Sequence, residues 1–228
     1  FASAIQNHQK NNFKVAEDLY NQILEIDPNH IKTIFFLGTL SVQTKNFDRA
    51  KQMLQKTIQA QPNNVDAYNN LGVVFKEFEE FQKAKDCFEK VIQIQPKHVD
   101  ALNNLGNVFK QLNEPQKAIN YYQKAIEIEP SYINAHQNLM DVCEKTNQIT
   151  ELKDAVSNAR TFFKDNSIIK LYEGILLSRN EKFVEAKNYL ESILFETKEI
   201  KNEILRVSTL AKCYDRIGGT DKAFNYFK

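Results

Sequence analysis

Tryptophan is absent from the chain, and glycine, proline and cysteine are scarce, with six, five and three residues among 228. Because glycine and proline interrupt helices, their scarcity favours a chain that is helical over nearly all of its length. Long apolar runs are lacking too: the longest, residues 34–40, is far shorter than the roughly 20 residues of a membrane-spanning helix. We therefore expect no membrane partner.

An excess of charge of either sign is also missing. The net charge is +1, from 30 basic and 29 acidic residues, which gives no global electrostatic reason to expect a nucleic-acid partner. The three cysteines, Cys87, Cys143 and Cys213, lie far apart and form no Cys-x-x-Cys pair. We interpret them as reduced core residues of a cytoplasmic protein.

What the chain does contain is an internal repeat. Residues 65–96 and 99–130 are identical at 18 of 32 aligned positions, and the matched residues lie 34 apart. A constant period of this size indicates one supersecondary unit that is stacked on copies of itself.

Each copy is predicted to be two helices joined by a tight turn. In residues 65–98 one apolar face is formed in the first half by Tyr68, Leu71, Gly72 and Phe75, and another in the second half by Phe81, Ala84, Phe88 and Val91. This spacing is helical, and the small Gly72 and Ala84 should let the two helices approach closely. One helix pair cannot bury its apolar face alone, so neighbouring copies must stack.

The pattern resembles the tetratricopeptide repeat (TPR) family. Residues 99–130 carry the small and aromatic positions of that family's motif: Leu105-Gly106, Phe109, Ala118, Tyr122, Ala125 and Pro130. The resemblance implies an all-α fold, a right-handed α-α superhelix (solenoid) of about seven TPR helix hairpins. Steps of 34 give a single array over 1–228, with repeats near 1–30, 31–64, 65–98, 99–132, 133–166, 167–203 and 204–228, the first and last incomplete.

The later repeats depart from the motif. In the fifth, Met140 and Leu152 replace the small residues, and we expect their bulk to push the two helices apart and to change the local twist. Three extra residues then shift the register, and we place them in a polar loop near 196–202. Near the end, Phe224 and Phe227 need a covering helix, so we expect the natural protein to continue beyond Lys228.

The resemblance implies a ligand site on the concave surface, which the first helices line. Asn70, Asn104 and Asn138 precede the Leu-Gly positions there, at intervals of 34. This series is similar to the asparagine ladder in the TPR arm of O-linked N-acetylglucosamine transferase, where such residues bind a peptide's backbone amides. An amide side chain offers a donor and an acceptor together, so a ladder can follow an extended main chain. Alternatively, each asparagine bonds to a neighbouring helix.

The remaining predicted groove positions are polar and mildly basic: Asn69, Asn103, Asn107, Lys76, Lys110 and Gln111. Some TPR proteins grip a C-terminal carboxylate with a clamp of lysines and asparagines, but Asn69 and Asn103 stand where that clamp has lysine. We therefore do not expect a carboxylate clamp. The ladder also ends at Phe36, which takes the equivalent place in the second repeat, and we expect Phe35 and Phe36 to be buried against the first repeat.

Catalytic residues are not indicated. The four histidines, His8, His30, His98 and His136, are scattered, and no His, Cys, Asp and Glu cluster has the spacing of metal ligands. No phosphate-binding loop or nucleophile motif occurs. We expect no enzyme activity in this chain, no metal and no cofactor.

The predicted function is that of a protein- or peptide-binding scaffold, which mediates a protein–protein interaction by holding an extended ligand in its concave groove. An alternative is a substrate-recruiting arm of a transferase whose catalytic domain lies outside this chain. Residues 211–228 are similar to the last TPR before the sulfotransferase domain of some bacterial TPR-sulfotransferases, and glycosyltransferases carry similar arms. Self-association through the end helices is a third possibility.

Overall fold

The computed structural model describes residues 1–193, 200–219 and 223. Within these residues every regular element is an α-helix, and there are thirteen of them. The chain forms two compact units, Phe1–Ile128 (unit 1) and Glu129–Lys228 (unit 2). The prediction of an all-α fold is confirmed.

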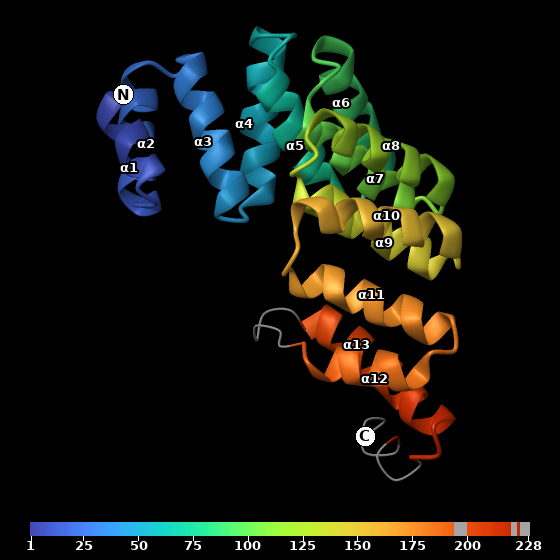
Figure 1. The fold of residues 1–228 in the computed structure, drawn as a ribbon. Coiled ribbons are helices and arrows are strands. Elements are labelled where there is room, and N and C mark those ends of the chain that lie inside the picture. The colour runs from blue at the N-terminus through green and yellow to red at the C-terminus, as the bar shows by residue number, and fades with distance from the viewer. Residues whose placement is uncertain (194–199, 220–222, 224–228) are drawn as a thin grey trace. The chain divides into compact units, whose positions relative to one another are not determined.

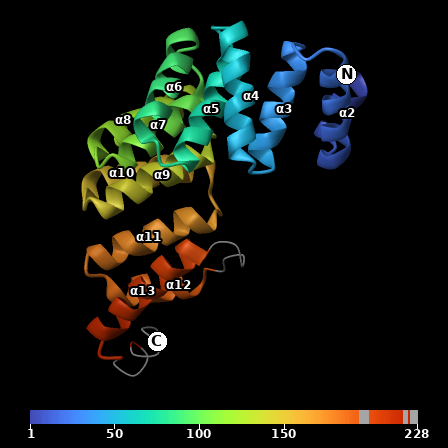
Figure 2. The same cartoon turned by 180° about the vertical axis from the view of Figure 1, so that it is seen from behind.

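Unit 1 holds eight helices in four antiparallel pairs. They are α1 (Ala2–Gln9) with α2 (Phe13–Ile26), α3 (Ile31–Gln43) with α4 (Phe47–Ala60), α5 (Val65–Glu77) with α6 (Phe81–Ile94), and α7 (Val99–Gln111) with α8 (Pro115–Ile128). The members of each pair contact one another, and α4 and α6 also contact the first helix of the following pair. Figures 1 and 2 show α3, α4 and α5 side by side.

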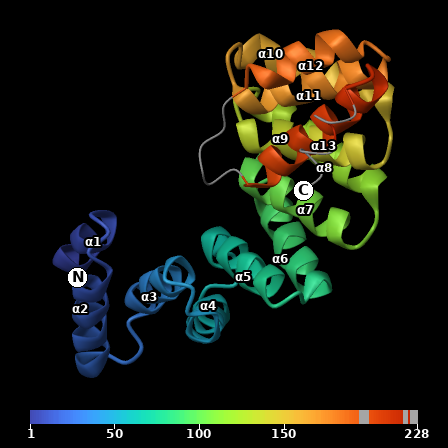
Figure 3. The same ribbon diagram turned by 90° about the horizontal axis from the view of Figure 1, so that it is seen from below.

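Unit 2 holds the other five described helices. They are α9 (Ile133–Lys145), α10 (Ile149–Phe162), α11 (Ser167–Arg179), α12 (Phe183–Glu191) and α13 (Ile200–Arg216). Figure 3 shows them stacked within this unit, where α11 contacts α9, α10, α12 and α13. None of the described helices is both long and apolar enough to cross a membrane.

The period of 34 appears directly in the helix boundaries. First helices begin at Ile31, Val65 and Val99 in unit 1, and at Ile133 and Ser167 in unit 2. The turn inside each hairpin recurs at the same interval, because Asn11, Lys45, Glu79, Asn113, Asn147 and Glu181 all have φ between 57° and 62°. One left-handed residue per turn therefore reverses the chain at a fixed place in every repeat.

The two helices of a hairpin approach closely at the glycine, as predicted. A Cβ atom added at Gly72 would lie 2.7 Å from Phe88 Cε1, and one added at Gly106 would overlap the ring of Tyr122. Ala84 and Ala118 are fully buried on the facing helices. The small residues of the motif thus make room for the large ring at the centre of each of these two hairpins.

Histidine side chains cap the N-termini of two of the first helices. Nδ1 of His30 accepts a hydrogen bond from the backbone N–H of Thr33 at 3.2 Å, and Nδ1 of His98 accepts one from Ala101 at 3.2 Å. At the same place in the third hairpin, Oδ1 of Asn64 accepts from Ala67 at 2.9 Å. Each side chain satisfies one of the orphan N–H groups of its helix.

The fifth hairpin packs as its sequence indicates. Met140 and Leu152 are fully buried, and α9 and α10 pack less closely than α5 and α6, which have the same lengths. The looser packing agrees with the predicted effect of the bulky residues, and the expected change of twist stays a prediction.

The predicted polar loop near 196–202 is partly wrong. Helix α13 already begins at Ile200, and Asn202 is buried within it, with 6% of its surface exposed. Residues 196–199 lie outside the described part of the chain, as do Phe224 and Phe227 of the last predicted helix.

Candidate functional site

The first helices of unit 1 form one continuous surface. Helix α5 contacts α3 on one side and α7 on the other. Leu71, Val74 and Phe75 of α5 are buried, whereas Asn69 and Asn70 on the same helix are half-buried.

Asn70 and Asn104 occupy matching places on α5 and α7, and both are half-buried. Nδ2 of Asn70 donates a hydrogen bond to Oγ1 of Thr39 on α3, at 3.2 Å. The bond ties two neighbouring hairpins together, which is the structural role considered above as the alternative. It uses one donor of the amide and leaves its carbonyl oxygen for another partner.

The residues before them differ in burial. Asn103 is buried, with 6% of its surface exposed, and it takes part in an interaction within the protein. Asn69 is half-buried, and its Oδ1 atom is buried yet accepts no hydrogen bond from the described residues. A buried acceptor without a donor costs about 1–3 kcal/mol, so this carbonyl oxygen is an unsatisfied polar group beneath the surface of α5.

Other predicted groove residues have mixed roles. Oδ1 of Asn107 accepts a hydrogen bond from the hydroxyl of Tyr122 at 2.9 Å, which joins α7 to α8 inside one hairpin. Lys76 and Lys110 are half-buried near the ends of their helices, and Gln111 is exposed. Asn107 therefore has a structural role. Lys76 and Gln111 lie on the accessible part of the surface.

The series of asparagines stops at the second hairpin for a visible reason. Phe36, at the equivalent place on α3, stacks on Tyr20 of α2 with ring centroids 6.3 Å apart and an interplanar angle of 15°. Phe35 contacts Phe36 edge to face at 5.3 Å. Phe36 therefore packs against the first repeat as predicted, although both Phe35 and Phe36 are half-buried rather than buried.

In unit 2, Asn138 is half-buried on α9 and takes part in an interaction within the protein. Its neighbour Asp141 is almost fully buried and pairs with Nζ of Lys201 at 2.9 Å and of Lys145 at 3.5 Å. Tyr172, which takes the ladder position on α11, is 1% exposed. Burial, and then the charge of Asp141, raise the pKa of Tyr172.

The first helices of unit 2 enclose a hollow of about 220 Å³. Its walls come from α9, α11 and α13 and include Glu144, Ile175, Arg179, Ser208 and Lys212. Arg179 donates to Oδ1 of Asn147 and to Oε1 of Glu144, both at 3.0 Å. The surface of the first helices is therefore recessed here, and its rim carries charges of both signs.

Comparison with known families agrees with this architecture. Two models, both described as "Tetratricopeptide repeat", match the sequence: one at residues 65–98 and 99–132, the other at residues 8–72. Together they span more than half of the chain. The chain belongs to the tetratricopeptide repeat family. A comparison with curated proteins finds no match.

Solved TPR structures share the fold. MamA is 27% identical, with a TM-score of 0.64, over 71% of this chain and 96% of its own. A TPR protein from Parabacteroides merdae is 15% identical, with a TM-score of 0.74, over 99% of this chain and 88% of its own. YrrB, described as a TPR protein with an unusual peptide-binding site, is 17% identical, with a TM-score of 0.61, over 90% of this chain and 96% of its own.

The TPR register reveals a polar cluster that the sequence analysis missed. Glu173 stands where Leu71, Leu105 and Leu139 stand in other repeats. Its carboxylate pairs with Arg160 of α10 and accepts from the hydroxyl of Tyr189 of α12. The signal was present in the sequence, because a charged residue at the Leu of the Leu-Gly motif needs partners when it is buried.

Neither His8 nor Cys87 is available as a reactive group. His8 bonds to Tyr20 and Gln43, and burial raises the pKa of the Cys87 thiol to about 12, so this thiol is protonated at neutral pH and is a poor nucleophile. Among the described residues no group of three or more His, Cys, Asp or Glu is placed to hold a metal ion.

Proposed function

We propose that this TPR protein is an interaction scaffold that binds an extended segment of a partner protein along its first helices. The observation that carries the proposal is the hollow of about 220 Å³ that α9, α11 and α13 enclose. It lies on the surface built only from first helices, so a chain that follows this surface in unit 2 passes over it.

The chemistry of the surface in unit 1 suits a peptide main chain. Asn70 and Asn104 occupy the same place in successive hairpins. Asn104 offers a half-buried amide group, and Asn70 offers the carbonyl oxygen of its amide. Donors and acceptors at a regular spacing recognise backbone amides rather than particular side chains.

The solved relatives support the same reading. YrrB is described as having a peptide-binding site, and it shares the fold of this chain. Asn138 holds the corresponding sequence position in unit 2, one repeat before Tyr172. The contribution of each asparagine is expected to be small, because a hydrogen bond contributes about 1 kcal/mol net, so affinity must come from several of them.

Selection from a phage-displayed library of random dodecapeptides provides the test. A selected peptide, measured by fluorescence anisotropy, should bind about fivefold more weakly to Asn104→Ala, since one hydrogen bond of about 1 kcal/mol is lost. The exchange Lys56→Ala, at an exposed position of α4, is the control and should leave affinity unchanged.

The peptide itself distinguishes backbone from side-chain recognition. If the ladder binds the main chain, N-methylation of central peptide bonds abolishes binding, whereas single alanine exchanges in the peptide have small effects. Selected peptides that bind Asn104→Ala and the Asn70→Ala/Asn138→Ala double variant as tightly as the original protein would overturn the proposal.

A further inference from the structure

A second surface of the molecule, on its second helices, carries two hollows of the same construction. The first, of about 480 Å³, lies in unit 1 between α6 and α8, with the end of α7 as its floor. The second, of about 520 Å³, lies in unit 2 between α10 and α12, with α11 as its floor. Neither is lined by the asparagines of the ladder.

The lining residues of the two hollows correspond at two repeats, or 68 residues, apart. Lys85 corresponds to Lys153, Phe109 to Leu177, and Tyr121 to Tyr189. Each hollow thus has a lysine on one wall, a large apolar side chain in the floor and a tyrosine on the other wall. Recurrence in both units indicates a consequence of the repeat rather than a local irregularity.

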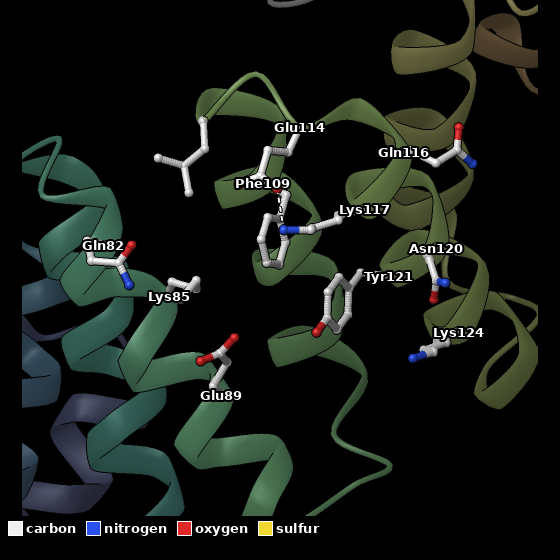
Figure 4. A pocket seen from close by; sticks show the side chains of 11 residues that line it. Gln82, Lys85, Glu89, Phe109, Glu114, Gln116, Lys117, Asn120, Tyr121 and Lys124 are labelled. Atoms are coloured by element: carbon white, nitrogen blue, oxygen red, sulfur yellow. Dashed lines mark ion pairs between the residues drawn. The ribbon is translucent and has the colours of Figure 1, made fainter.

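The hollow in unit 1 combines aromatic faces with positive charge. Figure 4 shows Lys85 on α6 opposite Tyr121 and Lys124 on α8, with Phe109 between the two walls. The rings of Phe109 and Tyr121 are stacked, 5.3 Å apart and 5° from parallel. Nζ of Lys117 lies 5.3 Å from the centre of the Phe109 ring, and Nζ of Lys124 lies 5.3 Å from that of Tyr121.

The equivalent lysine one repeat earlier shows what a lysine at the position of Lys85 binds. Lys51, which corresponds to Lys85, pairs with Oε1 of Glu80 at 3.7 Å and lies over the rings of Phe75 and Phe78 at 5.5 and 5.6 Å. A carboxylate and an aromatic ring therefore engage this lysine together within the protein itself.

The same pairing is not made at the hollow in unit 1. Glu114, which corresponds to Glu80, pairs instead with Lys117 of its own helix. Lys85 forms no ion pair with any residue that the structure describes. The hollow is lined by three lysines and two glutamates, which gives its lining a net charge of +1.

The hollow in unit 2 likewise contains a lysine that forms no ion pair with the described residues. The residue that corresponds to Glu80 and Glu114 is Lys182, so no carboxylate stands at that place. Arg160 is paired with Glu173, whereas the exposed Lys153 is not paired with any residue of the described chain. Leu176 and Leu177 add an apolar wall.

We infer that these outer hollows bind an acidic peptide segment of a partner protein, in which a carboxylate pairs with Lys85 or Lys153 and an adjacent apolar side chain enters the hollow. The ligand carboxylate pairs with the lysine of the hollow in the same way that Glu80 pairs with Lys51. This surface lies on the second helices, so it is independent of the peptide site proposed on the first helices. Opposite charges also make the binding sensitive to salt.

The test uses a fluorescein-labelled peptide with alternating glutamate and leucine or phenylalanine, titrated with the full chain and followed by anisotropy. The peptide should bind, and its affinity should fall at least tenfold for the double variant Lys85→Glu/Lys153→Glu. A peptide with glutamine in place of glutamate should not bind. The neutral pair Lys85→Gln/Lys153→Gln should weaken binding by a smaller factor, and circular dichroism checks that all variants fold.

Two controls separate this site from general charge and from the first-helix surface. Lys14→Glu/Lys56→Glu changes the charge equally at exposed positions of α2 and α4 and should leave affinity unchanged, as should Asn104→Ala. Equal weakening by the control pair, no weakening by the lysine pair of the hollows, or no binding of the acidic peptide would each overturn the inference.

Discussion

At the scale of single residues, the glycines of the first helices determine how closely the two helices of a hairpin approach each other. We predict that Gly72→Ala destabilises the protein by about 1 kcal/mol in urea denaturation. Alanine is favoured in a helix by about 1 kcal/mol, but its Cβ would lie 2.7 Å from the Phe88 ring, and overpacking costs about 1–3 kcal/mol.

Gly38→Ala is the matched control for this prediction. Its added Cβ would lie 3.1 Å from Leu54 Cγ and from Met53 Cβ, a milder overlap that a shift of the neighbours by a few tenths of an ångström would relieve. We expect this exchange to be neutral or mildly stabilising. Equal free energies of unfolding for the two variants would show that the ring at Phe88 does not limit the approach.

The hairpin turns give a second prediction at this scale. Glu79 is exposed and has φ of 58°, a left-handed conformation that is unfavourable for a residue with a Cβ. Glu79→Gly should stabilise the protein by about 0.5–1 kcal/mol in the same assay. Asn113→Gly should change stability less, because asparagine already tolerates this conformation; a larger gain at Asn113 would contradict the argument.

Residue-level roles were the hardest to predict from sequence. The sequence predicted no role for the scattered His30 and His98, yet both cap helices. Asn107 seemed to belong to the groove, yet it bonds to Tyr122. Such roles depend on which partner lies nearby in three dimensions, and a one-dimensional period does not contain that information.

At the scale of helices, α9 carries a buried histidine whose protonation opposes folding. His136 is fully buried, its Nε2 bonds to the carbonyl of Pro130 at 2.9 Å, and it packs against the rings of Phe162 and Phe163. Burial lowers the pKa of His136, and the bond to Pro130 only partly opposes this shift. The folded protein therefore holds this imidazole neutral.

The pH dependence follows from the direction of that shift. Above about pH 6.5, the ordinary pKa of histidine, His136 is neutral in both states and its contribution to stability is complete. As the pH falls below about 6.5, the unfolded chain binds a proton that the folded chain resists, so the free energy of unfolding decreases. His136→Leu, which copies Leu102 of the preceding repeat, should weaken this decrease between pH 7.5 and 5.5; an unchanged slope would exclude His136 as its source.

Helix positions, in contrast, were largely predictable. The starts at Ile31, Val65, Val99, Ile133 and Ser167 follow the repeat, because each hairpin contacts only its neighbours and the same local pattern gives the same local structure. The prediction was wrong where the register shifts, since α13 begins within the segment expected to be a loop. An insertion removes the periodic reference that fixes a boundary.

At the scale of the whole molecule, the chain is a repeat protein with units of unequal packing. Repeat arrays unfold approximately as sums of local terms, and α9 and α10 pack less closely than α5 and α6. We predict faster amide hydrogen exchange in α9 and α10 than in α5 to α8, measured by mass spectrometry on the full chain. Slower exchange in α9 and α10 would contradict the link between the degenerate motif and local stability.

The two proposed surfaces differ in the chemical groups that they offer to a partner. The first helices carry amides for a peptide main chain, and the second helices carry lysines and aromatic rings for acidic side chains. The repeat places both kinds of residue at fixed steps, and we propose that the scaffold uses them for two different partners.

The central claim, that the first helices bind a peptide main chain, is tested most directly by the side-chain amide signals of the asparagines in a ¹⁵N–¹H correlation spectrum of the full chain. Titration with a peptide selected on the protein should shift the NH₂ signals of Asn70, Asn104 and Asn138 and leave that of Asn120, on the second helix α8, unmoved. Shifts at Asn120 with none at the three ladder asparagines would contradict the account.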